Sequence, residues 1–168
     1  LSLLLLLSVT ACEKEQSSVA TPAKSSITTD GNVLIFPSIE QYEALVNDLT
    51  EEKEQAFLSE ISELKYDNYF SVPRASNGAT PEMDPFLGQL LNKDGVIQIG
   101  NHVFNIDLKS DQVFVLDAAY KMTADYEDLL KGNTANEQVK AYSTGDDVLH
   151  LMNNPAAEKC GGIGGGTY

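Results

Sequence analysis

The chain has 168 residues, of which 25 are acidic and 11 are basic, so its formal net charge is −14. That length fits one domain, and 42% hydrophobic residues are enough to build a core. The acidic balance argues against nucleic acid as a partner, because phosphate binding needs clustered lysine and arginine. It also argues against adsorption to anionic lipids through a basic patch.

The first twelve residues resemble the end of a lipoprotein signal peptide. The apolar stretch 1–11 is about half as long as the ~20 residues of a membrane-spanning helix, and it has the length of a secretory h-region. It ends in Val9-Thr10-Ala11-Cys12, which resembles the lipobox of bacterial lipoproteins. In that family the peptide is cleaved before the cysteine, which receives a diacylglycerol on its sulfur and an acyl chain on its amine. The alternative is an N-terminal strand with an ordinary cysteine.

The resemblance implies that Cys12 is the lipidation site and that the protein is held on a membrane by its acyl chains. One acyl chain holds only marginally, whereas two or more hold stably. Cys160 is then the only thiol of the mature chain, which leaves no internal disulfide. The sequence has neither an initiator Met nor a basic n-region before the apolar stretch, so we expect the natural chain to begin earlier.

The residues after Cys12 suggest where the protein is displayed. Glu13-Lys14-Glu15-Gln16 resembles the surface-export signal of lipoproteins from Bacteroidota, although a solvated linker would look the same. The resemblance implies the cell envelope, at the outer membrane, with surface exposure. Small and hydroxylated residues follow, so we expect 12–29 to be a lipidated cysteine with a flexible tether. We expect a globular domain over 30–153 and a Gly-rich flexible tail over 154–168.

The first half of the predicted domain contains one strand and three helices. Val33–Phe36 is a short apolar run that fits a buried strand. Ser38 and Thr50 each predict a helix start, and the apolar spacing after each is helical. Asp84 followed by Pro85 predicts a third helix start. Residues 38–67 carry nine acidic and two basic side chains, which we interpret as the solvated side of a helix pair rather than a binding face.

In the second half of the predicted domain, apolar residues recur at every second position, which is the period of a β-strand. Three strands are predicted at 96–99, 102–108 and 112–116, joined by short turns into an antiparallel meander. Helices are predicted over 123–131 and 146–152. Helices gathered before and after a meander argue for a small single α+β domain.

Alternation within the middle strand separates its side chains into two sets. The core face is predicted to carry Phe104, Ile106 and Leu108. Asn105 then belongs to the opposite face, which we expect to be solvated.

The segment 84–116 also resembles a part of uncharacterised Bacteroidota envelope lipoproteins. The shared features are a short helix, the run Asn-x-Asp-Gly-x-Ile-Gln-Ile-Gly at 92–100, and a strand pair. No activity and no catalytic residues are assigned to that segment. The resemblance therefore implies only the surroundings of the cell envelope.

The sequence identifies no metal, cofactor or catalytic site. Asn92-x-Asp94 matches half of a calcium loop, but Leu90 stands where the first ligand is needed, so a β-turn explains the run better. His102 and His150 lack metal-ligand spacing. Cys160 has no nearby His or helix start to activate it, and no helix follows the glycines after it to make a phosphate site.

Two functional classes remain. The favoured one is a non-enzymatic envelope lipoprotein whose small acidic domain serves in binding or assembly, with an envelope protein or a glycan as ligand. The alternative is an envelope glycan- or peptide-active hydrolase that uses paired carboxylates. No carboxylate stands in a recognisable catalytic motif, which favours binding.

Overall fold

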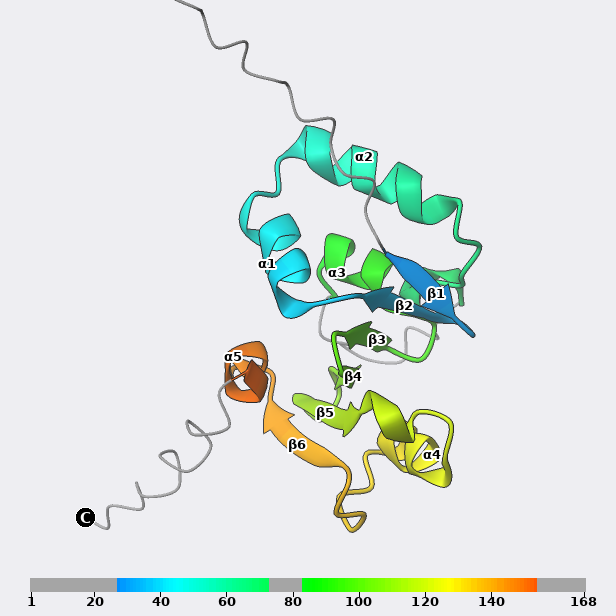
Figure 1. Ribbon diagram of the computed structural model, residues 1–168, viewed down its shortest axis with the longest axis vertical. Helices are drawn as coiled ribbons and strands as arrows, with labels where there is room; N and C mark the ends of the chain where they lie inside the picture. The colour runs from blue at the N-terminus through cyan, green and yellow to red at the C-terminus, as the bar shows by residue number, and fades with distance from the viewer. Residues whose placement is uncertain (1–26, 73–82, 154–168) are drawn as a thin grey trace, which may run out of the picture.

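A computed structural model describes residues 27–72 and 83–153, and Figure 1 shows their order in space. Within these residues the strands are β1 (Thr28–Asp30), β2 (Val33–Phe36), β3 (Val96–Ile99), β4 (His102–Asp107), β5 (Gln112–Asp117) and β6 (Lys140–Ser143). The α-helices are α1 (Ile39–Asn47), α2 (Glu51–Ser62), α3 (Pro85–Leu90), α4 (Ala124–Lys131) and α5 (Val148–Asn153). Two short 3-10 helices are η1 (Tyr69–Ser71) and η2 (Ala118–Tyr120).

The strands form one six-stranded sheet in the order β1-β2-β3-β4-β5-β6. Neighbouring strands are antiparallel except β2 and β3, which run parallel with Ile35 opposite Gln98. The α+β class is confirmed, and the predicted meander is the β3-β4-β5 centre of the sheet. The sequence predicted only the three antiparallel strands of this meander, whereas the sheet has six strands and includes one parallel pair. The helices between β2 and β3 provide the long crossover that a parallel pair requires.

Both edge strands were missed by the sequence prediction. β1 takes Thr28 and Thr29 from the stretch assigned to the tether, and it pairs with β2 through a tight turn at Gly31, whose φ is +62°. β6 pairs with β5 at the other edge. Both strands are short and polar, because an edge strand buries little apolar surface, and so neither shows the alternating pattern that marks a strand.

The predicted helix starts are confirmed by their capping bonds. Each capping side chain accepts a hydrogen bond from a backbone N–H of the first turn, which satisfies a donor that the helix leaves free. The last predicted helix begins at Val148, two residues later than expected. Gly132 ends α4 in the left-handed conformation, with φ +62°. The four caps are Ser38 to Gln41 at 3.3 Å, Thr50 to Lys53 at 3.3 Å, Asp84 to Leu87 at 2.8 Å and Thr123 to Asp125 at 3.2 Å.

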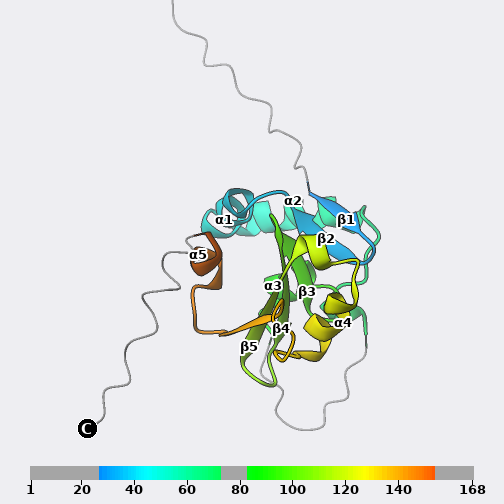
Figure 2. The same ribbon diagram turned by 60° about the horizontal axis from the view of Figure 1, so that its bottom comes forward.

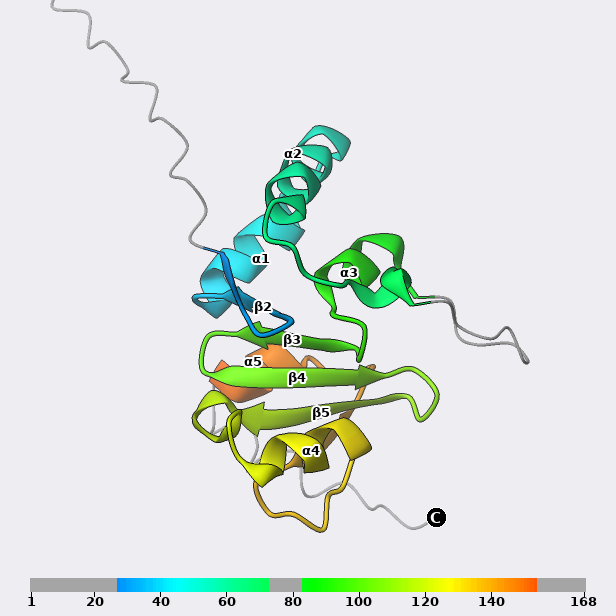
Figure 3. The ribbon, with the colours of Figure 1, turned by 90° about the vertical axis from the view of Figure 1, so that its right-hand side faces the viewer.

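Helices cover both faces of the sheet, and Figure 3 shows α4 in front of it and α5 behind. The predicted core face is confirmed: Phe104 is buried, and Ile106 and Leu108 pack against the same cluster. The expectation of a solvated opposite face was wrong, because Asn105 is only 5% exposed. Alternate residues of the central strands are apolar on both faces, and each set meets helical side chains.

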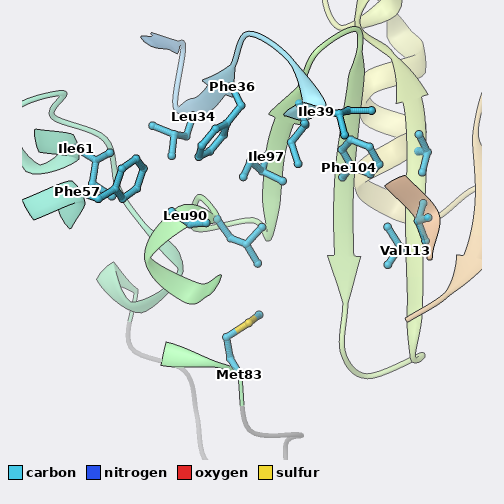
Figure 4. Close-up of a cluster of buried hydrophobic side chains, with 14 residues drawn as sticks. Leu34, Phe36, Ile39, Phe57, Ile61, Met83, Leu90, Ile97, Phe104 and Val113 are labelled. Atoms are coloured by element: carbon cyan, nitrogen blue, oxygen red, sulfur yellow. The ribbon is translucent and has the colours of Figure 1, made fainter. Parts of the chain in front are cut away.

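The larger core lies on the side of α1, α2, α3 and α5 and is drawn in Figure 4. Aromatic rings connect its layers: the Phe36 ring lies 6.1 Å from the Phe57 ring of α2 and 5.3 Å from the Tyr42 ring of α1. The smaller core lies under α4. Its buried members are Val33, Val96, Val103, Phe114, Leu116, Leu129 and Val139.

Candidate functional site

Several residues singled out by the sequence lie outside the described part of the chain. These are Cys12 with the signal peptide, the tether up to residue 26, and Cys160 with the Gly-rich tail. The lipidation of Cys12 and the roles assigned to these segments therefore stay predictions.

Asn92 organises a β-turn, as the sequence indicated. Its side chain is 2% exposed, and its Oδ1 accepts hydrogen bonds from the backbone N–H groups of Asp94 and Val96, both at 2.9 Å. Gly95 completes the turn with φ +82°, and a Cβ there would lie 2.9 Å from the carbonyl oxygen of Ile106. The Asp94 carboxylate pairs with Lys93 at 2.8 Å. Because the Asn92 oxygen is committed to backbone amides, this run is a structural turn.

The two histidines lie on different elements of the fold. His102 is half-buried at the start of β4, with its ring 6.3 Å from the Phe104 ring. His150 lies within α5. Among residues 27–72 and 83–153, no group of three His, Cys, Asp or Glu side chains could hold a metal ion.

A pair of carboxylates that the sequence did not single out lies on α4. Asn136 donates through its Nδ2 to Asp125 at 2.7 Å and to Asp128 at 2.8 Å, and so it bridges the two. Asn133 donates to Asp128 at 2.9 Å, and the Thr123 hydroxyl donates to Asp125 at 2.7 Å. The three-residue spacing of the carboxylates on a helix was visible in the sequence. The role of Asn136, which lies eight residues beyond Asp128 and joins the two carboxylates, was not visible.

The electrostatics of this pair do not suit acid–base catalysis. The hydrogen bond from Asn136 lowers the pKa of Asp125, and those from Asn133 and Asn136 lower the pKa of Asp128. A glycoside hydrolase of the paired-carboxylate kind needs one carboxyl group whose pKa is raised, so that it can donate a proton. Here both groups are ionised acceptors. These hydrogen bonds hold the loop that contains Asn133 and Asn136 against α4.

Lys121 makes a second polar connection, between η2 and the β1–β2 hairpin. Its side chain is 9% exposed, and its Nζ lies 3.1 Å from Asp30 Oδ2 and 3.3 Å from Gln98 Oε1. Figure 2 shows the yellow-green segment after β5 beside this hairpin. The contact joins residues 91 positions apart, so no local pattern could predict it.

Large hydrophobic side chains are exposed at three places in the described chain. Val46 lies on α1 at 40% exposure, and Phe70 and Val72 lie at and after η1 at 49% and 43%. The third place is η2 and the residue that follows Lys121, where Tyr120 is 37% exposed and Met122 is 88% exposed. A methionine exposed to that extent makes almost no contact within the domain.

No protein-family model, curated protein or solved structure matches this chain. None of the helices in the described residues is long and apolar enough to cross a bilayer.

Proposed function

We propose that this protein is a membrane-anchored lipoprotein of the bacterial cell envelope that displays its small acidic domain for binding or assembly. The observation that carries the proposal is the run of apolar residues ending in Val9-Thr10-Ala11-Cys12. Acyl chains on Cys12 would hold the domain on the outer membrane without any basic surface. The acidic residues behind Cys12 extend the proposal to display on the cell surface.

The position of the first strand is compatible with this arrangement. The described chain begins at Ile27 and β1 at Thr28, which leaves 27 − 12 = 15 residues after Cys12 up to and including Ile27. A chain of that length spans at most about 50 Å when extended, and roughly 20 Å on average as a flexible coil. The domain would therefore stand within one or two domain diameters of the bilayer.

The proposed ligand is an envelope protein or a glycan. The carboxylate pair at Asp125 and Asp128 gives no support to the hydrolase alternative, because Asn136 lowers both pKa values whereas a paired-carboxylate hydrolase needs one that is raised. Nucleic acid remains disfavoured by the net charge of −14.

The lipid anchor is tested by fatty-acid labelling. The chain is expressed in a bacterium behind an initiator Met and a basic n-region, as wild type, Cys12→Ala and Cys160→Ala. Wild type and Cys160→Ala should incorporate labelled fatty acid and gain the mass of the lipid. Cys12→Ala should take up no label and persist as uncleaved precursor, because the lipoprotein peptidase needs the modified cysteine.

Membrane association alone does not show that Cys12 is lipidated, since an uncleaved apolar segment can also associate with a bilayer. Incorporation of the labelled fatty acid is therefore the deciding measurement. Equal incorporation by wild type and Cys12→Ala, or loss of label only in Cys160→Ala, would refute the anchor.

A further inference from the structure

We propose that Tyr120 and Met122 form a contact with the lipid surface when the domain is anchored through Cys12. This inference rests on the proposed function, because it needs the domain to be tethered close to a bilayer. The occupant is the interfacial region of a zwitterionic membrane, where acyl chains meet the headgroups.

The chemistry of the segment 118–122 suits this occupant. Ala119, Tyr120 and Met122 are exposed, and 118–122 itself contains no acidic residue, the nearest in sequence being Asp117 and Asp125. Tyrosine is enriched at membrane interfaces, where its ring lies among acyl chains and its hydroxyl reaches water. The thioether of Met122 is apolar and flexible, so its burial in lipid removes surface that the fold leaves in water.

The Lys121 side chain makes the exposed surface of this segment less polar and fixes its position. Its Nζ turns back to Asp30 and Gln98, so the ammonium does not extend outward between Tyr120 and Met122. Asp30 ends β1, the strand that begins two residues earlier at Thr28, next to the first described residue. The chain that carries the anchor thus joins the fold on the strand to which this segment is bonded (Figure 2).

The other exposed hydrophobic residues fit the bilayer less well. Val46 lies on α1, within the stretch 38–67 that carries nine acidic and two basic side chains, and this acidic surface disfavours approach to lipid phosphates. Phe70 packs within the domain, because its ring lies so close to Gly88 that a Cβ added at Gly88 would be 2.3 Å from the Phe70 ring. The position of Met122 has no comparable explanation within the domain.

The chain contains no tryptophan, which allows a single-tryptophan test. Met122→Trp and the matched control Val46→Trp are made in the full chain, lipidated in a bacterium and checked by mass. Each is reconstituted into phosphatidylcholine vesicles with and without bromine on the acyl chains. We expect Met122→Trp to show blue-shifted emission and strong quenching by the brominated lipid, and Val46→Trp to show neither.

The outcomes separate the two proposals. If mass analysis finds no lipid on Cys12, the proposed function fails. If lipid is present but the emission of Met122→Trp is not quenched, or is quenched no more than that of Val46→Trp, the contact is refuted and the anchor stands. Replacing part of the lipid by anionic phosphatidylglycerol should reduce the quenching, because the domain is acidic; quenching that increases would contradict the inference.

Discussion

At the scale of single residues, the hydroxyl of Tyr66 stands out. It is the one buried side-chain oxygen or nitrogen atom of the described residues that has no hydrogen-bond partner. Burial raises the pKa of Tyr66 well above its ordinary value of about 10. A buried hydroxyl without a partner costs about 1–3 kcal/mol, whereas the ring that carries it contributes to the larger core.

We therefore expect Tyr66→Phe to be as stable as wild type or more stable at neutral pH, because the variant keeps the ring and removes the unpaired oxygen. In wild type the folded pKa is raised, so stability falls as pH increases beyond about 10, where Tyr66 ionises only in the unfolded chain. Tyr66→Phe should lose less stability over that range. Burial also raises the pKa of Tyr42 and Tyr126, so part of the alkaline loss should remain.

Urea unfolding on both sides of that pH measures the effect, with the exposed Tyr120→Phe as the control that should change nothing. A clear loss of stability of Tyr66→Phe at neutral pH would mean that the hydroxyl has a partner in solution, such as a bound water.

At the scale of elements, α4 and the loop after it are joined by the Asn136 amide. Asn136→Ala removes the hydrogen bonds to Asp125 and Asp128, so the pKa of each carboxyl should rise toward its ordinary value near 3.9. Depressed carboxyl pKa values stabilise the fold above that ordinary value, and the contribution is lost as pH falls through the folded pKa. Wild type should thus exceed Asn136→Ala in stability near neutral pH, and the difference should shrink in acid.

Carboxyl titration by NMR and unfolding at several pH values check this. The matched control is Asn133→Ala, which should affect Asp128 and spare Asp125. Unchanged titration of both carboxyls in Asn136→Ala would show that the bridge does not persist in solution.

Local signals explain which elements the sequence could predict. The caps at Ser38, Thr50 and Asp84 and the meander of β3 to β5 depend on residues a few positions apart, and these predictions are confirmed. β1 and β6 were missed because polar edge strands have no buried face to pattern. The parallel pairing of β2 with β3 was missed because it joins distant segments.

The candidate sites also divide into those marked by a local sequence signal and those that depend on long-range contacts. The proposed anchor at Cys12 rests on a contiguous motif that is visible in the sequence, and it stays a prediction because Cys12 lies outside the described residues. The bridge at Asn136 and the contact of Lys121 with Asp30 depend on tertiary structure, so no sequence pattern marked them.

At the scale of the whole molecule, the sheet is an inner layer with helices on both sides. Phe104→Ala should cost about 3–5 kcal/mol, because it leaves a cavity in the larger core. Asn105→Ala should also be costly, roughly 1–3 kcal/mol, because its side chain is buried beneath the opposite layer. Denaturant unfolding measures both, and the exposed Lys109→Ala should stay within about 0.5 kcal/mol of wild type. A negligible loss of stability in Asn105→Ala would instead support the original expectation that this face of the sheet is solvated.

The parallel pairing of β2 with β3 has a consequence for the order of folding. Ile35 and Gln98 are 98 − 35 = 63 residues apart, whereas Ile99 and His102 of the β3–β4 hairpin are 102 − 99 = 3 apart. Closing the longer loop costs roughly 3 kcal/mol more in chain entropy. The hairpins of β3 to β5 can therefore nucleate first, and β1 and β2 dock late. In a chain synthesised from its N-terminus, the β1–β2 hairpin must wait for the middle of the protein before β2 can pair with β3 and join the larger sheet.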